Sequence, residues 1–219
     1  MRARKLNGFK AFIFDLDQTL IDSLGRFYVA FIEALKKFKK KPIDYRTFLK
    51  LYEDDKLNTL LKGLSLEDFW NYFLKIYDEV NAPPSRPIEG SLELLKKLKV
   101  KGIKVAVVTG RRTPKEKLIR VLSDMNFMKY IDLVITAEED DEISRGFLKV
   151  NLLKEVMKRL NVKAEECVYV GDYKPDIISG KTLGFFTIGV LTGKEKPEVL
   201  KELGADLVIG KVGDLIDLI

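Results

Sequence analysis

Two aspartates near the N-terminus have the type and spacing of a metal site. Residues 11–14 form the apolar run Ala-Phe-Ile-Phe, and Asp15 and Asp17 follow it. A short apolar run that ends in polar residues is typical of a buried strand in a parallel sheet. Two close carboxylates repel each other unless a cation lies between them, and Mg²⁺ prefers such oxygen ligands. The pair therefore predicts a metal site, although an acidic turn after a strand has the same pattern.

Two later apolar segments end in polar residues that suit the same chemistry. One ends in Thr109 and Gly110, and the other ends in Gly171 and Asp172, with Asp176 on the following helix. In a sheet ordered 3-2-1-4-5 these strands flank the first one, so all three ends converge. The carboxylates then supply oxygens for Mg²⁺, while the threonine hydroxyl and nearby N–H groups suit a phosphate oxygen. Singly, each residue also fits a turn or a helix cap.

The elements that must position these residues belong to two patterns. From residue 88 onward, helices alternate with strands, and the six short apolar strands of the chain predict a doubly wound, Rossmann-like parallel sheet of the α/β class. Residues 24–80 instead carry apolar side chains at helical spacing, which predicts a small helical bundle. We therefore expect a core of residues 1–22 and 84–219, with an inserted helical domain over residues 23–83.

The composition excludes several classes of catalysis. The chain of 219 residues contains no histidine, which rules out Ser-His and Cys-His catalysis and histidine-based zinc sites. Its single cysteine, Cys167, lies in an apolar strand segment, so we expect a buried thiol and no disulfide. Acid and base chemistry must therefore use carboxylates, lysine or tyrosine.

Charge and apolar patterning also limit the partners. The net charge is +6, but Lys and Arg are interspersed with Asp and Glu, so we expect solvated helix faces and no nucleic-acid partner. The apolar runs are too short for a membrane span or a signal peptide, so we expect a cytoplasmic protein without a membrane partner, as a monomer or homodimer. The 33% of charged residues, with a single glutamine, resembles the composition of thermophilic proteins.

Together, the motifs resemble those of the haloacid dehalogenase-like (HAD) hydrolase superfamily. The resemblance rests on the D-x-D-x-T motif at residues 15–19, on Thr109 at a strand end, and on the G-D-x-x-x-D motif at residues 171–176. Their order and strand context cover most of the chain. The helical segment directly after the first motif resembles the cap domain of that family.

The resemblance implies a role for each motif residue. Asp15 would be the nucleophile that forms an aspartyl-phosphate, and Asp17 would be the general acid and base. Mg²⁺ would be bound by Asp15, the backbone carbonyl of Asp17 and Asp172, with Asp176 in support. A carboxylate attacks a phosphate dianion only if its charge is neutralised, which the metal provides.

The implied activity is a Mg²⁺-dependent phosphatase acting on a small phosphorylated metabolite, similar to phosphoglycolate phosphatases. Haloacid dehalogenases lack an acid at the position of Asp17, because displacement of a halide needs no proton. A phosphomutase with the same fold and a non-catalytic binding protein are the alternatives. An intact nucleophile and acid argue against the binding protein, which needs neither.

Two residues depart from the family pattern. Gln18 stands where glycine is frequent in the family. The family's Lys-Pro step is missing before the helix that starts near residue 150. The phosphate-binding cation is then either Lys149 or Arg145, since both precede the helix that starts near residue 150. We expect Lys149, with Thr109 and Gly110, to bind phosphate, because lysine is the residue type that the family uses and a fixed cation is needed opposite Thr109.

Overall fold

The structure is a computed structural model that describes residues 6–139 and 148–219. The chain divides into two compact units, one made of Met1–Ile21 and Arg86–Ile219 and the other of Asp22–Ser85. The predicted insertion, residues 23–83, falls within the second unit. In the described part of the chain, every helix is too short or too polar to span a bilayer.

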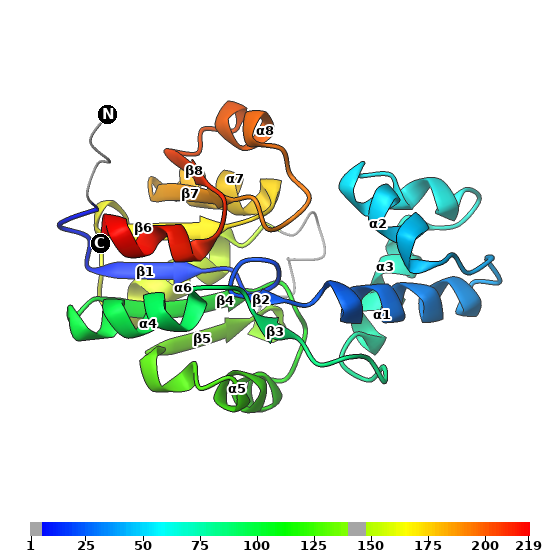
Figure 1. Cartoon of the computed structure of the whole chain (residues 1–219), viewed down its shortest axis with the longest axis horizontal. Helices are drawn as coiled ribbons and strands as arrows, with labels where there is room; N and C mark the ends of the chain where they lie inside the picture. The colour runs from blue at the N-terminus through cyan, green and yellow to red at the C-terminus, as the bar shows by residue number, and fades with distance from the viewer. Residues whose placement is uncertain (1–5, 140–147) are drawn as a thin grey trace. The chain divides into compact units, whose positions relative to one another are not determined.

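A parallel six-stranded sheet forms the centre of the first unit. Its strands are β1 (Ala11–Phe14), β4 (Lys104–Thr109), β5 (Leu133–Thr136), β6 (Cys167–Gly171), β7 (Phe186–Val190) and β8 (Leu207–Ile209). From bottom to top in Figure 1 they lie in the order β5-β4-β1-β6-β7-β8, so β4 and β6 flank β1. This confirms the predicted α/β fold and the predicted neighbours of the first strand.

Helices cover both faces of the sheet. The alternation of β1 places Phe12 and Phe14 in one apolar cluster and Ala11 and Ile13 in another. The helices, including short 3₁₀ turns, are α4 (Ser91–Val100), α5 (Lys115–Asp124), η2 (Met128–Tyr130), η3 (Ala137–Glu139), α6 (Val150–Leu160), η5 (Ala164–Glu166), α7 (Lys174–Leu183), α8 (Pro197–Glu202) and η6 (Val212–Leu218). The first cluster includes residues of α4, α5 and η6, and the second includes residues of α6, which contacts α7.

Several short elements were absent from the sequence-based prediction. Strands β2 (Ile21–Asp22) and β3 (Arg86–Pro87) form a separate two-stranded sheet. At two residues each they are too short for any alternation to be recognised. The terminal 3₁₀ helix η6 buries Val212 and Leu215 in the core, a pattern too brief to show a helical period.

The second unit is helical, as its apolar spacing predicts. It contains α1 (Leu24–Lys37), α2 (Tyr45–Glu53), the 3₁₀ helix η1 (Leu57–Leu61) and α3 (Leu66–Ile76). The side chain of Asp44 accepts a hydrogen bond from Thr47 N (2.9 Å), and that of Ser65 accepts one from Asp68 N (3.2 Å), so these residues are the N-caps of α2 and α3. Its core is rich in aromatic rings, including the fully buried Phe31, Phe48 and Phe69.

Candidate active site

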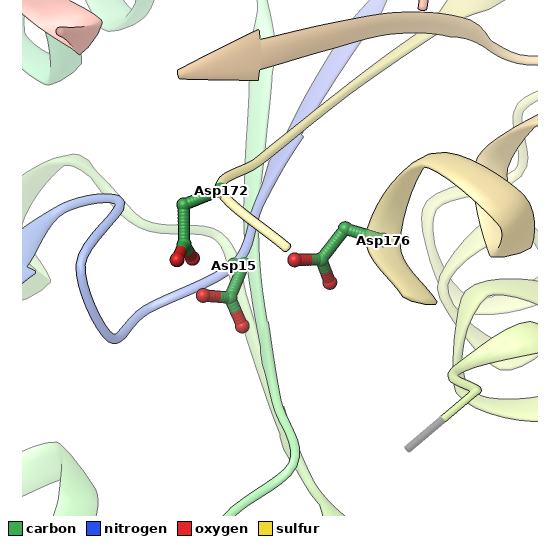
Figure 2. A group of neighbouring side chains, drawn as sticks. All are labelled: Asp15, Asp172 and Asp176. Atoms are coloured by element: carbon green, nitrogen blue, oxygen red, sulfur yellow. The ribbon is translucent and has the colours of Figure 1, made fainter. Parts of the chain in front are cut away.

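Three aspartates converge at the carboxyl edge of the sheet. Asp15 follows β1, Asp172 follows β6, and Asp176 lies in the first turn of α7. One carboxylate oxygen from each lies within 4.8 Å of those of the other two, and Figure 2 shows the three carboxyl groups gathered in one place. All three residues are buried. The structure therefore brings together three carboxylates that the sequence placed in one site.

Burial and mutual repulsion disfavour the charged forms of these carboxyl groups. Burial raises the pKa of Asp15 to about 7, with the charges of Asp176 and Asp17 acting in the same direction and that of Lys149 against it. Burial and the charges of Asp15 and Asp176 raise the pKa of Asp172 well above its ordinary value. A hard divalent cation would offset this repulsion, and the clustered carboxylates are the ligands that such a cation takes. The residues therefore fit a metal such as Mg²⁺.

Lys149 provides a buried cation next to the predicted nucleophile. It directly precedes α6, and its side-chain ammonium donates hydrogen bonds to Asp15 Oδ1 and, at 2.8 Å, to Asp176 Oδ1. Burial opposes the charged form, but the charges of Asp15 and Asp176 hold the pKa of Lys149 well above its usual range. The ammonium therefore stays charged. The other predicted candidate, Arg145, lies outside the described residues.

Asp176 orients this lysine through a buried hydrogen-bond network. Its Oδ1 also accepts a hydrogen bond from the Tyr169 hydroxyl (2.8 Å), and its Oδ2 accepts one from Tyr173 N (3.2 Å) at the start of α7. The helix-cap interpretation of Asp176 is thus correct alongside its place in the carboxylate cluster. The backbone N–H of Lys149 donates to Ser179 Oγ (2.9 Å), which anchors the residue from a second side. The sequence analysis did not identify Tyr169 as a site residue, because a tyrosine within an apolar strand is usually a core residue.

The side chain of Asp17 lies in a two-pronged ion pair with Arg111. Arg111 Nε donates to Asp17 Oδ2 (2.7 Å), and Nη2 donates to Oδ1 (2.5 Å). The side chain of Arg111 is 7% exposed and that of Asp17 is 29% exposed. The sequence had singled out Asp17 and the end of β4 but not their pairing. The sequence feature that could have predicted this pair is Arg111 itself, a guanidinium two residues beyond the end of β4 and at the same edge of the sheet as Asp17.

Thr109 and Gly110 occupy the end of β4, beside β1. Thr109 is fully buried, and its Oγ1 accepts a hydrogen bond from Arg111 N (3.2 Å), so its own proton can be donated to another acceptor. Gly110 follows it and is half-buried. The backbone of Arg111 is held on its other side, where its carbonyl accepts from Ala137 N (2.9 Å).

The turn after Asp17 connects the first motif to the third. Thr19 Oγ1 donates to Asp172 Oδ1 (3.2 Å). Gln18 has a φ of 58°, in the left-handed region that glycine adopts without cost, which explains why glycine suits this position. The carbonyl of Gln18 accepts a hydrogen bond from the Thr192 hydroxyl, so the loop after β7 also contacts this turn.

Two glycines allow the backbone to approach the carboxylates closely. A Cβ atom at Gly171 would lie 2.4 Å from Asp176 Cβ, and one at Gly193 would lie 1.9 Å from Asp172 Oδ2. Both contacts are shorter than real Cβ atoms show, so a side chain at either position would displace the cluster. Cys167 takes no part in the site: it is a buried free thiol, as predicted, and burial raises its pKa to about 12.

Comparison with known proteins agrees with this architecture. Residues 12–190 match the family described as haloacid dehalogenase-like hydrolase. The chain belongs to this family. A glyceraldehyde 3-phosphate phosphatase of Methanocaldococcus jannaschii is 31% identical over 96% of each chain. A phosphoglycolate phosphatase of Aquifex aeolicus is 28% identical, with 95% of this chain and 96% of the relative covered.

A solved structure shares the fold of this HAD-like hydrolase. A protein from Bacteroides fragilis, described as a haloacid dehalogenase-like hydrolase, superimposes with a TM-score of 0.79 and covers 95% of this chain and all (100%) of its own. Its sequence identity is 20%, so the likeness establishes the fold alone. The family assignment rests on the match over residues 12–190, which include the aspartates described above, and on the glyceraldehyde 3-phosphate phosphatase relative.

Proposed function

We propose that this protein is a Mg²⁺-dependent phosphatase that hydrolyses a small phosphorylated metabolite through an aspartyl-phosphate on Asp15. The observation that carries the proposal is the buried cluster in which Asp15 lies between two further carboxylates and the Lys149 ammonium. The relatives reported above are named phosphatases, which supports ester hydrolysis. Asp15, Asp172 and the backbone carbonyl of Asp17 would hold the metal, with Asp176 in support.

In the first half-reaction, a carboxylate oxygen of Asp15 attacks phosphorus. The bond between phosphorus and the ester oxygen breaks, and that oxygen takes a proton from Asp17, so the alcohol leaves neutral. Lys149 and the Thr109 hydroxyl donate hydrogen bonds to the non-bridging phosphoryl oxygens, with the Gly110 N–H beside them. When bound, Mg²⁺ neutralises charge on the phosphoryl oxygens and on Asp15.

In the second half-reaction, water attacks the same phosphorus atom. Asp17, now ionised, takes a proton from the water, and the bond between phosphorus and the Asp15 oxygen breaks. Inorganic phosphate leaves, and both aspartates return to their starting state. The guanidinium of Arg111 is placed to hold the Asp17 carboxylate between the two proton transfers.

The helical unit Asp22–Ser85 would act as a cap that shields the reaction from bulk water and contributes to substrate selection. The proposal includes a cytoplasmic enzyme, monomeric or homodimeric, without a nucleic-acid partner, as the composition predicts. The names of the relatives support hydrolysis over the phosphomutase alternative. The presence of Lys149 beside Asp15 supports a catalyst over a non-catalytic binding protein.

A substrate panel with and without Mg²⁺ tests the proposal. The panel consists of 4-nitrophenyl phosphate, glyceraldehyde 3-phosphate, 2-phosphoglycolate and pyrophosphate, with phosphate release as the readout. We expect turnover of at least one substrate in Mg²⁺, its loss in a chelator, and its loss in Asp15→Asn. The variant should stay folded, because it relieves a repulsion between buried carboxylates. A wild-type protein inactive on every member, or an active Asp15→Asn variant, would overturn the proposal.

A further inference from the structure

The ion pair between Arg111 and Asp17 points to a substrate-binding site that the reaction outlined above does not require. The Nε and Nη2 donors form one edge of the planar guanidinium, and the two oxygens of the Asp17 carboxylate accept from that edge. This edge matches a carboxylate or a phosphate, because both offer two oxygens at the right spacing. A neutral hydroxyl offers a single acceptor atom and cannot satisfy both donors.

The position of this edge is set by the backbone of Arg111. Its N–H donates to Thr109 Oγ1 (3.2 Å), and its carbonyl accepts from Ala137 N (2.9 Å). The side chain is 7% exposed, so packing restricts its motion, whereas Asp17 is 29% exposed. The guanidinium is therefore the fixed member of the pair, and the carboxylate is the member that can turn.

In the proposed reaction Asp17 contacts two partners, the guanidinium of Arg111 and the ester oxygen of the substrate. To contact the ester oxygen of a substrate, the Asp17 carboxylate must turn at least one oxygen away from the Arg111 edge, since both oxygens are engaged there. The donors released by that turn lose charge-assisted hydrogen bonds, which costs free energy unless another oxyanion replaces them. A substrate that brings such an oxyanion would favour the turn as it binds.

The side of the site on which Arg111 lies indicates which part of the substrate it meets. Lys149 contacts the nucleophile Asp15 and so serves the transferred phosphoryl group. Arg111 contacts Asp17, whose proposed partner is the ester oxygen of the leaving group. The Arg111 edge is therefore placed beside the leaving group, within a few bonds of the ester oxygen.

We propose that Arg111 binds a second anionic group of the substrate, a carboxylate or phosphate that is carried by the leaving group and is distinct from the transferred phosphoryl. This inference rests on the proposed phosphatase function and narrows its substrate class to short phosphate esters or anhydrides with a second negative charge. Binding of that group releases the carboxylate of Asp17, which takes a proton from solvent and turns toward the ester oxygen as the acid. The pair thus couples substrate selection to the placement of the acid.

A matched pair of esters tests the inference. 2-Phosphoglycolate and 2-hydroxyethyl phosphate differ only by a carboxylate in place of a hydroxymethyl group, and pyrophosphate provides the phosphate case. We expect kcat/KM in Mg²⁺ to be higher for a charged substrate by about 10- to 100-fold, the range of hydrogen bonds to charged groups. Arg111→Met should remove most of this preference, and Arg111→Lys should keep part of it. Preference for one charged substrate alone identifies the carboxylate or the phosphate as the recognised group.

The neighbouring Arg112 provides the control, because it is exposed and its removal changes the net charge equally. Arg112→Met should keep the preference of the wild type. Inhibition by phosphonoacetate and by 2-hydroxyethylphosphonate gives a readout that needs no turnover of the probe, and the wild type should bind phosphonoacetate more tightly by a similar factor. This comparison uses the wild type and Arg111→Lys, so it stands even if Arg111→Met is unstable.

Three outcomes would contradict the proposed role of Arg111. An equal loss on charged and neutral substrates in Arg111→Met would overturn the inference, since Arg111 would then serve only Asp17 or the phosphoryl group. A wild type that uses 2-phosphoglycolate and pyrophosphate no better than 2-hydroxyethyl phosphate would overturn it as well, and both results would leave the phosphatase function standing. A wild-type protein that hydrolyses none of the substrates would overturn the function and the inference together.

Discussion

The ammonium of Lys149 donates a hydrogen bond to the carboxylate of Asp15, although 134 positions separate the two residues in the chain. Both side chains are buried, so their charges interact with little screening by water. The same ammonium also contacts Asp176, and it is thus shared by two carboxylates. Loss of Lys149 would leave both carboxylates buried without the positive charge that it contributes.

Lys149→Met should lower turnover by about 10²-fold, by analogy with the loss of one preorganised donor. Methionine keeps an unbranched apolar side chain in the pocket but removes the positive charge, which further raises the pKa of the Asp15 nucleophile. Steady-state phosphate release measures the effect, with Arg145→Met as the matched control. Normal turnover in Lys149→Met together with a large loss in Arg145→Met would assign the phosphate-binding role to Arg145.

Asp17→Asn should slow esters with poor leaving groups far more than esters with good ones. An alkyl alcohol needs a proton as it departs and should lose about 10²- to 10⁴-fold, the contribution of general acid catalysis. 4-Nitrophenolate leaves without that proton, so its loss should be smaller. The ratio of the two kcat values is the measurement. Equal losses on both esters would show that Asp17 does not protonate the leaving group.

Mg²⁺ should stabilise the folded protein through the carboxylate cluster. At a hundred times its Kd, a ligand that binds only the native state adds about 2.7 kcal/mol, or roughly 5–10 °C in Tm for a chain of this size. Asp172→Asn should lose this shift, yet unfold no earlier than the wild type in metal-free buffer, because it removes a repelling charge and keeps an acceptor for Thr19.

Thermal scans with and without MgCl₂, at equal ionic strength set with NaCl, separate a bound ion from general screening. A shift of the same size in the wild type and in Asp172→Asn would place the Mg²⁺ effect outside the carboxylate cluster.

Tyr169→Phe should destabilise the fold by about 1.5–3 kcal/mol, the range for hydrogen bonds to charged groups. The ring stays in the core, and only the donor to Asp176 is removed. Tyr28→Phe is the matched control, because its partly buried hydroxyl donates to the neutral carbonyl of Ile43 (3.0 Å) and should contribute only about 0.5–1.5 kcal/mol. Urea unfolding measures both variants. A smaller effect at Tyr169 than at Tyr28 would contradict the buried network.

Local patterns were sufficient for the longer helices and strands and for the carboxylates of the site. The apolar run before Asp15 was long enough to identify β1, and the helical spacing of apolar residues over residues 24–80 identified the second unit as helical. The order of the strands followed from the rules of doubly wound α/β sheets ordered 3-2-1-4-5, in which the second and fourth strands flank the first. These rules place Asp15 and Asp172 at one edge of the sheet from the sequence alone.

The amino-acid sequence was therefore enough to predict the α/β fold and the three carboxylates that the structure brings together. The pairings became visible in the folded protein: Arg111 with Asp17 across 94 positions, and Tyr169 with Asp176 from strand to helix. The physical reason is the range of the forces involved. Helix caps and apolar periodicity act between near neighbours in the chain, whereas a buried ion pair or hydrogen bond depends on the orientation of side chains that packing alone brings together.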